Sequence, residues 1–320
     1  LDLYDIPNEW KGDYIPTNSM DSRHKEHTFN GFAGLNKNFG EKLSIDASLA
    51  AEHYKTAVWN EWTLYPTFNA TYTLKPGQIL QLSFSGNKQY PSYWSTNNTI
   101  SYVSSYVEVQ GKPYLKPSRE YEANLSYILK SKYIFSAFFN HVSDYFIQLP
   151  YQSPDRLTLV YKYHNFNYQQ QAGLQTVIPF KVKEFLNSRL TVVGYYKREK
   201  DNDFYNIPFD RSRYSFMVNM NNTFTVSSKP DIKFMLTGFY QNGTIQGIYD
   251  LSRSYNVNTA LRWTFANKHA QITLKGDDLF NTNLIKTSID YADQFSTMKT
   301  LMNNRALTLS FSYKFGNYKE

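Results

Sequence analysis

Aromatic side chains gathered in one stretch of the sequence are the strongest candidates for ligand chemistry. The stretch from residue 88 to residue 117 is rich in tyrosine and tryptophan, whose rings stack on sugars or peptides while their O–H and N–H groups form hydrogen bonds. Two tryptophans of a neighbouring connection are expected to join it. The predicted ligand-binding residues are Trp59, Trp62, Tyr90, Tyr93, Trp94, Tyr102, Tyr106 and Tyr114. Trp62, Tyr90 and Tyr114 stand near expected strand ends, where an aromatic girdle at a membrane surface is an equally good interpretation.

Metal-ligating residues form no convincing cluster in the sequence. Of the six histidines, only His24 and His27 are close together, and their charged neighbours make a solvated start of a strand the better interpretation. Asp201-Asn202-Asp203 and Asp277-Asp278 offer clustered oxygens of the kind that Ca²⁺ prefers, but acidic residues in a wet loop usually need no ion. We therefore predict neither a metal site nor a cofactor.

Catalytic signatures are also missing from the sequence. It contains no cysteine, which excludes thiolate nucleophiles, and it has no Gly-x-Ser-x-Gly elbow, phosphate-binding loop or dinucleotide fingerprint. The formal net charge is +7 and the pI is about 9.1, but the basic residues are dispersed rather than gathered in the stripe of a nucleic-acid-binding protein. We predict no enzyme and no nucleic-acid partner.

A hydrophobic period of two runs through most of the chain and predicts the strands that position these residues. In the final segment Leu307, Leu309, Phe311, Tyr313 and Phe315 alternate with polar residues. No apolar run approaches the roughly 20 residues of a membrane-spanning helix, and an aromatic content of 18% argues against disorder. The predicted strands span residues 25–37, 41–56, 61–75, 78–90, 118–130, 132–148, 165–181, 186–200, 211–227, 231–246, 253–267, 269–281 and 302–316.

The connections between these strands differ in length in a regular way. Short ones, such as 36–40, 75–77 and 130–132, alternate mostly with long ones, such as 88–117 and 149–164. Long strands with one apolar face, joined by short turns at one end and long loops at the other, are typical of a transmembrane β-barrel, whose closed sheet pairs every backbone group. A soluble sandwich, propeller or solenoid fits less well, because its strands are shorter or its sequence repeats. The predicted fold is an all-β, antiparallel, up-and-down transmembrane barrel.

Several motifs resemble those of a known family. The last strand is similar to the C-terminal assembly signal of outer-membrane barrels, because it alternates and closes on an aromatic residue. Its signal residues are Leu309, Phe311, Tyr313 and Phe315. Residues 276–281, Gly-Asp-Asp-Leu-Phe-Asn, resemble a motif of the penultimate strand in TonB-dependent outer-membrane receptors. Residues 81–85, 90–94 and 115–118 are similar to segments of the large barrel family related to those receptors.

The resemblance implies a receptor of the Gram-negative outer membrane that takes up a bulky nutrient, such as a glycan, a peptide or a metal chelate. In such receptors the outer loops bind the ligand, the barrel houses a plug domain, and the TonB–ExbB–ExbD complex rearranges the plug. The resemblance also implies contact with the barrel assembly machinery, outer-membrane lipid and lipopolysaccharide, and it leaves a surface lipoprotein open as a further partner.

The sequence departs from this family in its extent. About 13 to 14 strands are expected here against about 22 in the receptors, and neither a plug nor a TonB-contacting segment is recognised. We therefore interpret residues 1–320 as a single β-barrel domain, the C-terminal portion of a larger barrel, with residues 1–24 in an outer loop. No signal peptide is recognised at the N-terminus. A self-contained passive channel or a structural barrel is the alternative function, and an outer-membrane enzyme is a more distant one.

Overall fold

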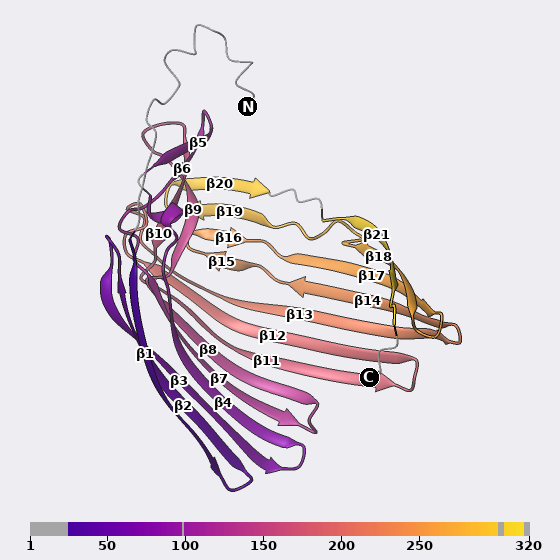
Figure 1. The fold of residues 1–320 in the computed structure, drawn as a ribbon. Helices are drawn as coiled ribbons and strands as arrows, with labels where there is room; N and C mark the ends of the chain where they lie inside the picture. The colour runs from indigo at the N-terminus through magenta and orange to yellow at the C-terminus, as the bar shows by residue number, and fades with distance from the viewer. Residues whose placement is uncertain (1–24, 98, 300–303, 317–320) are drawn as a thin grey trace.

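The computed structural model describes residues 25–97, 99–299 and 304–316 and shows a large curved antiparallel sheet (Figure 1). The sheet has thirteen strands in the order β1-β2-β3-β4-β7-β8-β11-β12-β13-β14-β17-β18-β21, so each strand pairs with the next one along the chain within this sheet. The bounds are β1 (His27–Phe39), β2 (Leu43–Lys55), β3 (Asn60–Lys75), β4 (Gln78–Gln89), β7 (Ser118–Leu129), β8 (Tyr133–Ser143), β11 (Tyr168–Val182), β12 (Leu186–Asp201), β13 (Phe209–Ser228), β14 (Asp231–Gln241), β17 (Ser254–Phe265), β18 (Ala270–Asp277) and β21 (Ala306–Tyr313). The predicted all-β, up-and-down arrangement is confirmed.

The register places apolar residues on one face of this sheet, called here the apolar face. Leu261 pairs with Phe234 on one side and with Leu274 on the other, and Leu274 pairs with Leu309. Residues directly opposite each other point to the same face. Leu261, Leu274 and Leu309 are 45%, 42% and 72% exposed, so this apolar row has no protein packed over it.

The other face of the sheet, called here the polar face, is hydrophilic, as its first five strands show. The paired residues Asn36, Asp46, Asn69, Ser83 and Asn124 cross five neighbouring strands in one continuous row. A sheet that is apolar on one face and polar on the other suits a wall with lipid on one side and water on the other.

Short turns close one end of the sheet, called here the turn end. Lys130 and Ser131 have φ of 55° and 49°, so a turn with two left-handed residues joins β7 to β8, as in the tightest hairpins. Gly40 and Gly77 have φ of 61° and 78° in two further turns of this end, in a conformation that glycine adopts without strain.

The connections at the opposite end, called here the loop end, are folded rather than irregular (Figure 1). One four-stranded sheet contains β5 (Ile100–Ser104), β6 (Val107–Gln110), β10 (Leu159–Asn165) and β9 (Phe146–Gln152), and a second contains β15 (Thr244–Gln246), β16 (Tyr249–Leu251), β19 (Lys286–Tyr291) and β20 (Gln294–Lys299). The single-turn helix α1 (Tyr93–Thr96) is capped by the Ser92 side chain. We refer to these elements together as the lid.

Two predicted strands were wrong in extent. The predicted strand 132–148 ends at Ser143, because Asp144 adopts a φ of 51° and the chain enters β9 of the lid. The predicted strand 231–246 ends at Gln241, and the chain then enters β15. Apolar residues resume soon after both breaks, as at Tyr145 and Ile245, and the predicted strands were therefore extended past them. The last predicted strand begins at Ala306; residues 302 and 303 lie outside the described residues.

The two outermost strands of the large sheet, β1 and β21, are exposed along their whole length. Within the described residues, β1 pairs with β2 and β21 pairs with β18, and the two do not pair with each other. The sheet therefore has two free edges in the described part of the chain. No helix among the described residues is long and apolar enough to cross a membrane.

The two faces of β18 provide a matched test of orientation. We expect Leu274→Arg, on the apolar face, to destabilise the assembled protein by about 2 to 4 kcal/mol, the cost of Arg near the bilayer midplane. Thr273→Arg, one residue away on the polar face, should fold normally. Heat-modifiable gel mobility and urea titration of outer-membrane fractions measure the difference; equal loss for both variants would contradict the assignment of the faces.

Candidate functional site

The polar face carries hydrogen-bonding side chains toward the space that the curved sheet partly surrounds. A cavity of about 340 Å³ follows this face across β7, β8 and β11. Its polar lining residues are Glu122, Asn124, Asn140, Gln171 and Gln175. Four of these five side chains are amides, which both donate and accept hydrogen bonds, so this wall suits contact with water.

An apolar cluster holds the lid together above this wall. Its buried members are Leu149, Phe166, Phe204, Phe209, Ile248, Tyr249 and Ile289. These residues come from β9, β13, β16, β19 and the connections between strands, so no loop could bury its own apolar side chains alone. Phe166 lies 5.0 Å from Phe209, ring centre to ring centre, in an edge-on arrangement. Burial raises the pKa of Tyr249 well above its usual range, and its hydroxyl stays neutral.

A buried ion pair fastens the lid to the wall. The Lys197 ammonium lies 2.9 Å from the Glu199 carboxylate and also donates to the carbonyl of Ile245, at 2.9 Å. Glu199 is fully buried and accepts two more hydrogen bonds, one from the Gln169 side chain at 2.6 Å and one from the backbone N–H of Gly247. The hairpin of β15 and β16 is therefore bound to β12 through charges that have several partners, as buried charges require.

Gly247 makes this close approach possible. Its φ of 57° favours glycine, and a Cβ added there would lie 2.9 Å from the Phe166 ring. Its carbonyl accepts a hydrogen bond from Arg211 at 3.2 Å. The N–H of Gly247 is thus bound by Glu199 and its carbonyl by Arg211, both of them charged residues of the wall.

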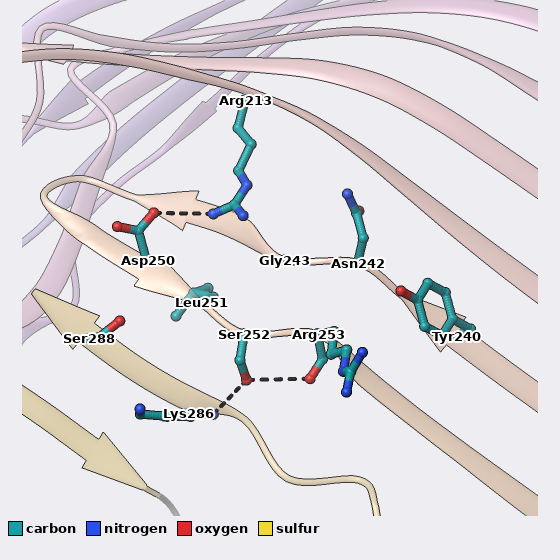
Figure 2. Close-up of a pocket in the computed structure, with 10 residues that line it drawn as sticks. All are labelled: Arg213, Tyr240, Asn242, Gly243, Asp250, Leu251, Ser252, Arg253, Lys286 and Ser288. Atoms are coloured by element: carbon teal, nitrogen blue, oxygen red, sulfur yellow. Dashed lines mark hydrogen bonds and ion pairs between the residues drawn. The ribbon is translucent and has the colours of Figure 1, made fainter.

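A fork at the loop end, shown in Figure 2, contains the most strongly charged cavity described here. β13 and β14 pair only as far as Met217 and Gln241, after which the chain leaves the wall and enters the hairpin of β15 and β16. The hollow that opens beside β13 has a volume of about 450 Å³. Its lining residues are Arg213, Tyr240, Asn242, Gly243, Asp250, Leu251, Ser252, Arg253, Lys286 and Ser288. We call it the fork pocket.

Three cations line the fork pocket against a single carboxylate. Arg213 extends from β13 toward the hairpin and donates to Asp250 at 3.1 Å, and Arg211 donates to the same carboxylate at 3.0 Å. Arg253 and Lys286 form no ion pair within the described residues. The pocket therefore keeps an excess of positive charge, which suits a negatively charged ligand.

Of the predicted aromatic residues, the structure brings two together. Trp59 and Tyr90 lie 5.7 Å apart, ring centre to ring centre, and both pack against Tyr54. The Tyr90 hydroxyl donates to Glu52 at 3.2 Å, on the polar side of β2. Tyr90 is therefore packed in this cluster, and its assignment to a ligand site stays a prediction.

The other predicted aromatic residues do not meet in one cavity. Trp62 is 59% exposed beside Phe29 and His53, on the apolar face, where a membrane girdle is expected. Tyr93 lies in α1. The other four side chains are largely exposed: Trp94, Tyr102, Tyr106 and Tyr114. Their spacing in the sequence did not predict this arrangement, in which Trp94 lies in α1, Tyr102 in β5, and Tyr106 and Tyr114 in turns of the lid.

The acidic and histidine positions considered for metals have structural partners. Asp201 is bound to His164 at 2.7 Å, and Asp278 accepts from the backbone N–H groups of Thr282 and Asn283 at 3.0 and 3.2 Å. Within the described residues no group of three or more such ligands is found. His24 lies outside the described residues.

Sequence reasoning missed the ion pair and the fork pocket. For the ion pair a signal was present, because Lys197 and Glu199 share one face of a predicted membrane strand, where charges are costly and usually functional. For the fork pocket no comparable signal exists, because its residues come from segments far apart in the sequence.

A model of the outer membrane protein beta-barrel family matches residues 3–313. The chain belongs to this family. It is therefore an outer-membrane β-barrel protein of a Gram-negative cell. The loop end of this family member is extracellular and its turn end periplasmic, because outer-membrane barrels have long loops outside and short turns inside.

Solved structures with a similar fold are receptors and a transporter rather than enzymes. The siderophore receptor PirA from Pseudomonas aeruginosa has a TM-score of 0.63 at 11% identity, over 91% of this chain and 48% of that chain. The ferric enterobactin receptor PfeA from the same organism gives 0.62 at 12%, over 91% and 46%. The FrpB iron transporter from Neisseria meningitidis gives 0.62 at 12%, over 92% and 46%. At these identities the likeness concerns the fold alone, and the chain spans about half the length of these structures.

None of the proteins of curated function that were compared with this sequence matches it significantly.

Removal of Glu199 should release the hairpin of β15 and β16. In Glu199→Ala the buried Lys197 ammonium loses its counter-charge, and breaking a buried pair in this way costs about 3 to 5 kcal/mol. We expect faster cleavage between residues 243 and 252 when intact cells are treated with protease. Glu184→Ala, in an exposed periplasmic turn, is the control; equal cleavage in both variants would show that the pair does not hold the lid.

Proposed function

We propose that this chain forms about half of the wall, and much of the extracellular surface, of an outer-membrane receptor that imports a bulky nutrient with energy supplied through TonB. The observation that carries the proposal is the folded lid over a polar-faced wall of thirteen strands. A passive pore needs an open mouth, whereas a receptor needs an ordered outer surface that binds its ligand first.

The free edges of β1 and β21 support a larger barrel. In hydrocarbon each unpaired backbone group costs several kcal/mol, so a membrane sheet has to close. About 22 strands are typical of outer-membrane receptors with a plugged barrel, and thirteen account for somewhat more than half of them. We propose that residues 1–320 form one barrel domain and that further strands and a plug complete it.

The candidate nutrients are a glycan, a peptide or a metal chelate. Two of the similar structures are receptors for siderophores, so a ferric siderophore is one specific candidate. The predicted aromatic residues other than Trp62, which lies on the apolar face, are proposed to contact the ligand from the loops; Trp59 and Tyr90 lie 5.7 Å apart, ring centre to ring centre. We propose no covalent chemistry for the chain.

The proposed partners follow from the same function. The TonB–ExbB–ExbD complex would act through the plug, and the barrel assembly machinery would recognise the final strand through Leu309, Phe311 and Tyr313. Phe315, the last residue of the proposed signal, follows this strand. Lipopolysaccharide would surround the outer half of the wall, and a surface lipoprotein would be a further partner at the lid.

Energy dependence separates the proposed transporter from a passive channel. Cells with and without the full-length gene are compared for uptake of labelled ferric siderophores, oligosaccharides and oligopeptides. We expect gene-dependent uptake of one class, and we expect that uptake to stop when the proton gradient is collapsed. Uptake that continues without the gradient would instead support a passive channel, and no gene-dependent uptake of any class would favour a structural barrel.

A further inference from the structure

We propose that the fork pocket binds an oxyanion, that is, a phosphoryl, sulfate or carboxylate group, held by Arg253 and Lys286 with Arg213 behind them. Two sources of this group are compatible with the pocket's place at the outer end of the wall: an anionic nutrient, in which case the inference rests on the proposed function, or a phosphate of lipopolysaccharide. The recognition chemistry is the same for both.

The pocket's uncommitted polar groups are chiefly hydrogen-bond donors. The Asn242 side chain already accepts from the backbone N–H of Phe216 at 2.7 Å and donates to the carbonyl of Tyr214 at 3.4 Å. The Ser252 hydroxyl accepts from the N–H of Lys286 and donates to the carbonyl of Arg253. What is left is the Arg253 guanidinium, the Lys286 ammonium and the hydroxyls of Ser288 and Tyr240. A pocket of donors fits a ligand that only accepts, as an oxyanion does.

Ion pairs within the protein neutralise only part of the positive charge of the fork pocket. Asp250 is shared by Arg211 and Arg213, and these contacts fix β16 against β13. One carboxylate cannot neutralise two guanidinium groups. Arg253 and Lys286 are exposed at the rim and take no part in this pairing. Their position around the same hollow has no structural explanation in the contacts of the described residues.

A like-charged pair that includes one residue of the pocket gives further support. Lys286 of β19 lies directly opposite Lys299 of β20 in the hairpin register. Like charges opposite each other destabilise a hairpin, since their side chains start only about 5 Å apart. The repulsion disappears when an anion binds between or beside them. An unoccupied pocket would thus weaken the hairpin that lines it, whereas an occupied one would stabilise it.

Gly243 has no side chain at the place where the anion would enter the pocket. Gly243 lies at the bend from the wall into the lid, and a Cβ there would be 2.7 Å from the carbonyl oxygen of Leu251 and 3.1 Å from the Arg213 guanidinium. Glycine therefore keeps the guanidinium unobstructed. The volume of about 450 Å³ accommodates a phosphorylated or carboxylated sugar ring rather than a single small ion alone.

Calorimetric titration of the purified full-length protein with inorganic pyrophosphate tests the pocket directly, at constant low ionic strength. We expect saturable binding by the wild type and at least about ten-fold weaker binding by Arg253→Gln/Lys286→Gln, because each charge-assisted hydrogen bond contributes substantially to affinity. Lys268→Gln removes a charge in a periplasmic turn and should bind like the wild type. Wild-type affinity in the double variant, or no binding by any of the three proteins, would overturn the proposal.

The source of the anion is found by two measurements on the same variants. If lipid supplies it, the wild type co-purifies with more phosphorylated lipopolysaccharide than the double variant does. If the nutrient supplies it, co-purified lipopolysaccharide is equal, and the double variant loses uptake of an anionic nutrient. Equality of both lipid content and uptake would contradict a site for either source. Pyrophosphate binding is measured without transport, so its failure is distinct from failure of the proposed transport function.

Discussion

Backbone hydrogen bonding in a medium without water is the constraint on which the rest of this structure depends. Within hydrocarbon, a sheet has to pair every N–H and C=O group internally, and this requirement leaves only the side chains free to meet lipid or water. The thirteen strands satisfy it between neighbours through pairing of successive strands, with apolar residues on one face and polar residues on the other; the outer edges of β1 and β21 stay unpaired within the described residues. The apolar row from Phe234 to Leu309 and the polar row from Asn36 to Asn124 both result from this single register.

The loop end is not subject to this constraint, because water there can form hydrogen bonds with backbone groups that have no partner in the protein. Its connections nevertheless form two small sheets around an apolar cluster. An apolar cluster by itself would leave the lid free to slide over the wall, since hydrophobic contact has little direction. The buried pair of Lys197 and Glu199 fixes the position of the lid, because hydrogen bonds are directional. Lys197 donates to the carbonyl of Ile245, and Glu199 accepts from the N–H of Gly247.

The fork pocket follows from the departure of β14 from the wall. While β13 continues outward paired with β12, its other edge borders the hollow beside the β15–β16 hairpin, and three of the four charged residues that line this hollow are basic. The same departure explains why the pocket lies at the level where the wall ends and the outer surface begins. Charge excess, donor groups and an opposed lysine pair therefore meet at the boundary between the membrane and the medium.

The sequence by itself determined the strands, their faces and the alternation of short turns with long loops, because these are local properties with a period of two. It placed Leu309 on the apolar face correctly, and the final strand and the motif at residues 276–281 indicated the family. Only the tertiary structure decided how the loops meet. Arg213 and Asp250, or Glu199 and Gly247, are tens of residues apart and belong to no shared pattern. The predicted aromatic residues from 93 to 114 lie on different elements, because the long connection between β4 and β7 folds into α1, β5 and β6 of the lid.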